Sequence, residues 1–102
     1  MKITRSQAGL SGITKTSYES AQFTISGAQN NYDVKTNTSK PSKTSRSITI
    51  KAFSACTIKL NSSANDAITF AAGEQQTFND LPVSNLYVTT TGDTIVRIIS
   101  SR

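Results

Sequence analysis

The chain of 102 residues contains no histidine and no tryptophan, and it has a single cysteine. Histidine is the commonest general base and the commonest metal ligand, so its absence argues against catalytic triads and most transition-metal sites. Cys56 has no partner for an internal disulfide, and its place in the alternating run "ACTIKL" predicts a small core residue. The six acidic residues are isolated from one another in the sequence. We therefore expect no catalytic residues, no metal, no cofactor and no enzymatic activity.

Charge and long apolar runs are also scarce. Charged residues make up 17% of the chain, against about 25% in typical soluble domains. The first fifteen residues, "MKITRSQAGLSGITK", contain no apolar core of a secretory signal. No segment approaches the roughly 20 apolar residues of a membrane helix. We expect synthesis in the cytoplasm without a signal peptide, and no membrane partner.

Residues with hydroxyl side chains are abundant in the sequence, because 15 Ser and 15 Thr account for 30 of the 102 residues. Thr, Ile and Val favour a pleated, half-buried surface. Apolar residues alternate with polar ones at Ile48, Ile50 and Ala52, and again at Cys56, Ile58 and Leu60. About seven short strands separated by turn signals indicate an all-β protein, a small antiparallel β-sandwich of jelly-roll or Ig-like type. No amphipathic helix is evident.

The first half of the chain is less regular and more basic than the second. Residues 1–17 have sparse apolar positions and predict an extended N-terminal arm, followed by one β-sandwich domain over residues 18–102. Residues 1–51 hold eight Lys/Arg against two acidic residues, a charge of +6, whereas residues 52–102 hold three against four, a charge of −1. Residues 35–47, "KTNTSKPSKTSRS", predict a basic, Ser/Thr-rich loop. Its basic-surface candidates are Lys35, Lys40, Lys43 and Arg46, either as ordinary solvated charges or as a strap on nucleic acid or an acidic neighbour.

The last two strands, "NLYVTTT" and "TIVRIIS", flank Gly92-Asp93, which predicts a hairpin with a type II′ turn. In that hairpin Tyr87 pairs with Ile98 on one face and Leu86 with Ile99 on the other, so both faces are apolar. A sheet packed on one side normally alternates apolar with polar residues. We therefore expect a second body to cover the hairpin, either a loop or the N-terminal arm of the same chain, or a neighbouring subunit. The subunit-contact candidates are Ile3, Leu10 and Ile13 in the arm, and Leu86, Val88, Ile95 and Ile99 in the hairpin.

Residues 70–100, "FAAGEQQTFNDLPVSNLYVTTTGDTIVRIIS", carry a resemblance to small virion proteins of tailed bacteriophages. The stretch runs from a G-E-x-x-x-F turn through "PVSNLYV" to a Thr/Gly tip and a closing Ile/Val strand. Similar stretches recur in β-sandwich domains of phage head, fibre and tail proteins. The resemblance covers about a third of the chain.

This resemblance implies a structural role in the virion, after synthesis in the host cytoplasm. The first expectation is a capsid auxiliary (decoration) protein that binds the major capsid protein in many copies. A neck or tail component is the alternative, and a homo-oligomer is compatible with both. A single-stranded nucleic-acid-binding β-barrel is a second class of function, because basic residues cluster near Tyr32 and Phe53. A carbohydrate-binding module is less favoured in a chain with no tryptophan and three tyrosines.

Overall fold

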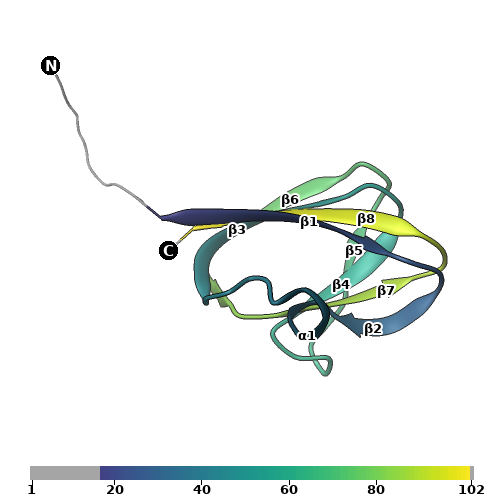
Figure 1. Ribbon diagram of the computed structural model, residues 1–102, viewed down its shortest axis with the longest axis horizontal. Helices are drawn as coiled ribbons and strands as arrows, with labels where there is room; N and C mark the ends of the chain where they lie inside the picture. The colour runs from purple at the N-terminus through teal and green to yellow at the C-terminus, as the bar shows by residue number, and fades with distance from the viewer. Residues whose placement is uncertain (1–16, 102) are drawn as a thin grey trace, which may run out of the picture.

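The computed structural model describes residues 17–101, which form two four-stranded antiparallel sheets packed face to face (Figure 1). Sheet A has the strand order β1-β8-β3-β6, and sheet B has the order β2-β7-β4-β5. The elements are β1 (Tyr18–Ile25), β2 (Gln29–Asp33), α1 (Val34–Thr38), β3 (Ser45–Ala52), β4 (Cys56–Leu60), β5 (Ile68–Phe70), β6 (Gln75–Val83), β7 (Leu86–Thr90) and β8 (Thr94–Ser101). The predicted arm, with Ile3, Leu10 and Ile13, lies outside the described residues.

The strand order identifies the sandwich as a jelly roll. The chain passes from one sheet to the other at nearly every connection, and only β4 and β5 are neighbours both in sequence and in space. Eight strands arranged as two such interleaved sheets are the jelly-roll architecture. The prediction of a small antiparallel β-sandwich is confirmed, and its jelly-roll form agrees with the structure. The described residues contain eight strands rather than the seven expected.

The core lies between the two sheets and follows the predicted alternation. Ile48, Ile50 and Ala52 of β3 face Ile58 of β4 across the sandwich, and all four are fully buried. Cys56, also predicted as a core residue, is buried as well. Because side chains in a strand alternate between faces, each inward position contributes apolar area, worth roughly 1.5–3 kcal/mol for a buried Ile, Leu or Phe.

The predicted terminal hairpin is wrong, because β7 and β8 belong to opposite sheets. β7 pairs with β2 and β4, whereas β8 pairs with β1 and β3. Gly92 also lacks the positive φ that a type II′ turn requires at its first central position. The apolar residues assigned to two faces of one ribbon mostly line the inner faces of two sheets. Leu86 and Val88 enter the core from sheet B, and Val96 and Ile98 enter it from sheet A.

The corner between β7 and β8 is fixed by contacts with the turn between β1 and β2. The Asp93 carboxylate accepts a hydrogen bond from the Gly27 backbone N–H at 2.6 Å. The buried Thr90 hydroxyl donates to the Gly27 carbonyl at 2.9 Å and accepts from the Gln29 N–H at 3.1 Å. Each of these two turns carries the chain from one sheet to the other, so the contacts hold the two layers together at one end.

The basic loop predicted over residues 35–47 is shorter in the structure, because the range begins within α1 and ends within β3. Asp33 caps α1 by accepting from the Thr36 N–H at 3.1 Å, so the helix includes Lys35. The loop is confined to residues 39–44, and β3 begins at the fully buried Ser45. Pro41 is fully buried as well. Asp is a favourable N-cap residue, because its side chain can accept a hydrogen bond from a backbone N–H in the first turn. The helix that Asp33 caps has only five residues, which is too short to show an amphipathic pattern.

β6 continues through Pro82, although proline cannot donate to a ladder of backbone hydrogen bonds. Proline is tolerated there because β6 is the edge strand of sheet A and needs no hydrogen bond on its outer side. A register shift opposite Ser45 and Ser47, with Asp80 at φ 57°, marks the same stretch as a bulge. Among the described residues, no helix is long and apolar enough to span a membrane.

Candidate protein-binding face

The side of sheet A that points away from the core forms the broadest candidate for a functional surface. We call it the sheet A face, and its members are Tyr18, Ser20, Gln22 and Thr24 of β1, Ile95, Arg97, Ile99 and Ser101 of β8, Ser47, Thr49 and Lys51 of β3 with the adjoining Phe53, and Gln75, Thr77 and Asn79 of β6. The strand registers align them in rows across the sheet. The members include no acidic residue.

Hydroxyl and amide groups tie neighbouring strands together across this face. The Ser47 hydroxyl donates to Asn79 Oδ1 at 2.8 Å, and the hydroxyls of Thr49 and Thr77 lie 2.9 Å apart. Such cross-strand pairs each add a few tenths of a kcal/mol to the sheet.

Apolar side chains are exposed on the same face. Tyr18 is 72% exposed, Ile99 is 45% exposed and Phe53 is 38% exposed. Only one other large apolar residue of residues 17–101 is comparably exposed, Leu81 at 40%, and it lies in the bulged part of β6. Three of the four therefore gather on one sheet surface. Exposed apolar side chains that share one surface are typical of protein–protein contact sites.

A cationic pair flanks Phe53 near one end of this face. Lys51 and Arg97 are directly opposite each other on β3 and β8. Lys51 Nζ lies 5.1 Å from the centre of the Phe53 ring, and Arg97 Cζ lies 5.4 Å from it. Like charges placed opposite each other destabilise a sheet, whereas each cation gains from the ring face. The aromatic ring thus offsets part of the repulsion and leaves a positive, aromatic cluster.

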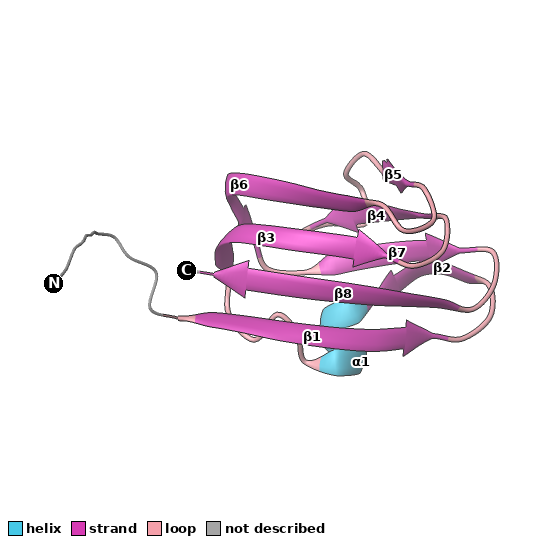
Figure 2. Cartoon of the chain, turned by 90° about the horizontal axis from the view of Figure 1, so that it is seen from above, coloured by secondary structure: helices cyan, strands magenta, loops and turns pink. Residues whose placement is uncertain are grey.

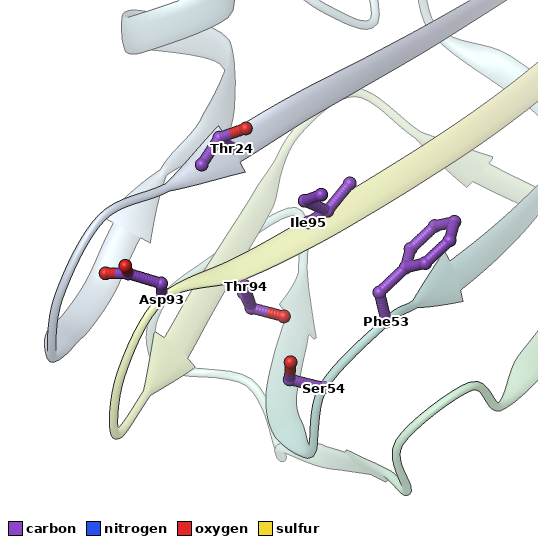
Figure 3. Close-up of a pocket in the computed structure, with 6 residues that line it drawn as sticks. All are labelled: Thr24, Phe53, Ser54, Asp93, Thr94 and Ile95. Atoms are coloured by element: carbon purple, nitrogen blue, oxygen red, sulfur yellow. The ribbon is translucent and has the colours of Figure 1, made fainter.

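A hollow of about 220 Å³ opens at the end of the sheet A face (Figure 3). Figure 3 shows the ring of Phe53 standing on one side of it, with Ile95 and Thr24 on the neighbouring strands. Ser54, Asp93 and Thr94 complete its lining. The Thr94 hydroxyl is buried and has no hydrogen-bond partner among the residues that the structure describes. Asp93 is the one titratable residue in this lining, and its carboxylate accepts a hydrogen bond from the Gly27 N–H.

Two further hollows have linings that do not resemble a catalytic site. One, of about 240 Å³, is lined by Arg46, Asp80 and Pro82. The other, of about 290 Å³, lies on the outer side of sheet B and is lined mainly by threonines together with Cys56. Burial raises the pKa of the Cys56 thiol, which disfavours the nucleophilic thiolate. Within residues 17–101, no group of three or more His, Cys, Asp or Glu side chains could hold a metal ion.

The predicted subunit-contact residues of the last two strands differ in their exposure to solvent. Leu86 and Val88 are fully buried in the core of the single chain, so the prediction that they contact a second subunit is wrong. Ile95 is half-buried beside Phe53, and Ile99 is the one hairpin candidate that is largely exposed. Sequence reasoning missed Tyr18. Its position in β1, alternating with inward residues, was the available signal.

The basic-surface candidates do not form one cationic strap. Lys40 forms an ion pair with Glu19 at 3.2 Å, and Lys35 is half-buried in α1. Lys43 and Arg46 are exposed, the first in the loop and the second in β3 beside Asp80. Glu19 is bound further by Ser42, whose N–H lies 2.8 Å from Oε2. Lys40 is thus paired within the fold and Lys35 belongs to α1 rather than to the loop, which weakens the prediction of a basic strap.

Comparison with known proteins places the chain by its fold alone. No family model matches the sequence, and no curated protein matches it either. Among solved structures it is similar to a de novo designed double-stranded β-helix determined by NMR in solution. The two share 13% identity with a TM-score of 0.51, over 82% of this chain and 99% of the design. At this identity the similarity supports the jelly-roll architecture and carries no information about activity.

Proposed function

We propose that this protein is a non-enzymatic structural component of a tailed-phage virion, a capsid auxiliary protein that binds and stabilises the particle. The observation that carries the proposal is the gathering of Tyr18, Phe53 and Ile99 on the sheet A face. An open sheet surface with exposed apolar residues among short hydroxyl side chains fits a protein partner better than a small molecule, which needs a concave site with convergent polar groups. The resemblance of residues 70–100 to phage virion proteins supplies the virion setting.

The fold is compatible with this role, since jelly rolls build viral capsid domains as well as lectins and cupins. A partner such as the major capsid protein would cover the sheet A face repeatedly, in many copies per particle. Lys51 and Arg97 near one end of it favour a partner surface that is acidic at the matching position. A neck or tail component would use the same face on a ring with fewer sites.

Co-sedimentation with capsid shells tests the proposal. The full chain is mixed with shells that lack it, and the bound copies per shell are counted by quantitative mass spectrometry. Hundreds of copies support the capsid role, and a few dozen or fewer support the neck or tail. Ile99→Ser should weaken binding, whereas Leu81→Ser should leave it unchanged, because Leu81 has a similar exposure but lies in the bulged part of β6, outside the rows that make up the face. No binding to shells, necks or tails by the unmodified chain would refute the proposal.

A single-stranded nucleic-acid-binding function is the second candidate, and the cluster of Lys51, Phe53 and Arg97 favours it. Single-strand binders combine cations with an aromatic ring on which a base can stack. The predicted outcome is retention on single-stranded DNA that falls with salt and is lost in Phe53→Ser. Neutralising Lys43 and Arg46 provides the control, because both are exposed basic residues outside the cluster. Retention that does not depend on Phe53 would reject this candidate.

A further inference from the structure

β1 is a long edge strand with few of the usual devices against pairing, since its one charged residue, Glu19, is bound by Lys40 and Ser42. It lies at one margin of sheet A, as Figure 2 shows, and within residues 17–101 it pairs with β8 alone. Its register with β8 runs through all eight residues from Tyr18 to Ile25 without a shift. Its sequence, YESAQFTI, contains no proline, glycine or lysine. A regular exposed edge of this kind is a template for a further strand.

The other three sheet edges in the described part of the chain are each blunted. β6 contains Pro82 and the bulge near Asp80. β2 has a register shift between Gln29 and Tyr32 and leads directly into α1. β5 is only three residues long. Proline, bulges and very short strands are the means by which proteins protect edges, so β1 stands out as the edge open to pairing.

The backbone groups of β1 that face outward can be identified from the next strands of the sheet. The Phe53 N–H donates to the Ile95 carbonyl at 2.9 Å. In an antiparallel sheet alternate residues of a strand bond to opposite neighbours, so 95, 97, 99 and 101 of β8 bond to β3. Positions 94, 96, 98 and 100 then bond to β1, where their register partners are residues 25, 23, 21 and 19. The N–H and C=O groups of Tyr18, Ser20, Gln22 and Thr24 therefore point out of the sheet.

From this geometry we infer that β1 pairs antiparallel with β1 of a second copy, which joins the two A sheets into one continuous eight-stranded sheet. A register with Tyr18 opposite Thr24 and Ser20 opposite Gln22 uses all four outward-facing residues and is symmetric about Ala21. A two-fold interface requires such self-complementarity. A shift by one residue would place the outward-pointing N–H and C=O groups of one copy opposite backbone groups of the other copy that already bond to β8. The only charge in β1, Glu19, is held by Ser42 and Lys40, so no like charges oppose each other.

The position of Tyr18 argues for a second copy as the occupant rather than an unrelated strand. Tyr18 is the most exposed large apolar residue of the described chain, at 72%. In the register above it lies opposite Thr24 of the other copy, on the same face of the joined sheet. The side chain of Thr24 lines the hollow of about 220 Å³ together with Ile95 and Phe53 (Figure 3). Each copy thus supplies one exposed aromatic ring and one apolar recess, and the symmetry brings them together twice.

This inference goes beyond the proposed virion role, because it requires no protein other than this chain. The test is the mass of the purified full chain in solution, measured by light scattering after size-exclusion chromatography over a range of concentrations. The expected mass is twice the 10.9 kDa of the chain. A monomer that persists up to about 0.1 mM would overturn the inference, since even micromolar affinity gives mostly dimer there. A trimer or larger ring would also overturn it, because a two-fold interface closes at two copies.

Gln22→Pro tests the edge itself. It removes an outward-facing N–H at the centre of the paired segment and leaves the backbone bonds to β8 in place. The hydrogen bond from Arg97 Nε to the Gln22 side chain at 3.4 Å is lost with it. The dimer dissociation constant should rise at least about tenfold. Thr77→Pro is the matched control on β6, the opposite edge of the same sheet. The Ala52 N–H donates to the Glu74 carbonyl at 3.1 Å, which by the same alternation directs the N–H of Thr77 outward. Thr77→Pro should leave the dimer unchanged.

Circular dichroism confirms that each variant is folded before its mass is compared. Should Gln22→Pro unfold, Tyr18→Ser replaces it, because Tyr18 is largely exposed in the single chain and its loss should weaken the dimer without unfolding the chain. A dimer that survives folded Gln22→Pro or Tyr18→Ser at the affinity of the unmodified chain would place the interface elsewhere and refute the inference.

Discussion

Two buried threonines on either side of the β7–β8 corner provide a sharp test of the hydrogen-bond pattern in the core. Thr90 is 5% exposed and Thr94 is 3% exposed. The hydroxyl of Thr90 both donates and accepts a hydrogen bond within the β1–β2 turn. The hydroxyl of Thr94 has no partner among the described residues. Replacement of each by valine keeps the shape and the β-branching, so only the hydroxyl is removed.

The two substitutions should change the free energy of unfolding in opposite directions. An unpaired buried hydroxyl costs about 1–3 kcal/mol, so Thr94→Val should stabilise the fold by about 1 kcal/mol. Thr90→Val loses two hydrogen bonds worth roughly 0.5–1.5 kcal/mol each, so it should destabilise the fold by about 1–3 kcal/mol. The expected difference between the variants is therefore about 2–4 kcal/mol.

Urea unfolding followed by circular dichroism, at one protein concentration for all variants, measures both changes. Equal slopes against urea are required for the comparison, because a changed slope would indicate a changed unfolded state. Destabilisation of similar size in both variants would show that the Thr94 hydroxyl is satisfied, and the assignment of an unpaired group would be wrong.

Three further predictions address acid stability, a loop contact and the two faces of β8. Burial acts to raise the pKa of Glu19, but hydrogen bonds from Ser42, with a smaller effect of the neighbouring lysine, hold it below its ordinary 4.5. The resulting stabilisation is complete above that ordinary value and is lost as the pH falls through the lowered folded pKa. The urea midpoint should therefore fall less between neutral pH and about pH 3 in Glu19→Gln than in the unmodified chain. An equal fall in both proteins would contradict this. Asn85→Ala should lower the free energy of unfolding by about 2–3 kcal/mol, because the Asn85 side chain accepts from two backbone N–H groups at 2.9 and 2.7 Å; a loss below about 0.5 kcal/mol would argue against both bonds. Ile98→Ala should cost about 2–5 kcal/mol in urea unfolding, whereas Ile99→Ala should cost less than about 1 kcal/mol, since the first is fully buried and the second is 45% exposed; similar losses would reverse the assigned faces.

The predicted strands and core positions agree well with the structure where the signal is local. The alternation at Ile48 and Ile50, and at Ile58 and Leu60, identified inward residues correctly. This succeeds because the side of a strand on which a residue lies depends only on its parity along that strand. The burial of Cys56 followed from the same pattern.

The failures arise where the outcome depends on residues distant in the sequence. Consecutive strands flanking a short turn can pair in one sheet or face each other across a core, and both arrangements give the same alternation. In this chain the contacts of Thr90 and Asp93 with Gly27, 63 and 66 residues away, accompany the second arrangement. The candidate face shows the same limit, because Lys51, Phe53 and Arg97 meet only through the pairing of β3 with β8.

The sequence alone determined that this is a β protein with a small apolar core, hydroxyl-rich outer surfaces and no histidine for catalysis or metal binding. Those properties follow from composition and from a repeat of two residues, which are local. Only the tertiary structure decided which strands are neighbours, and hence that β8 is interior while β1 is an exposed edge. The reason is physical: any strand can offer its backbone groups to any other, so the choice of partner is made by how the whole chain packs.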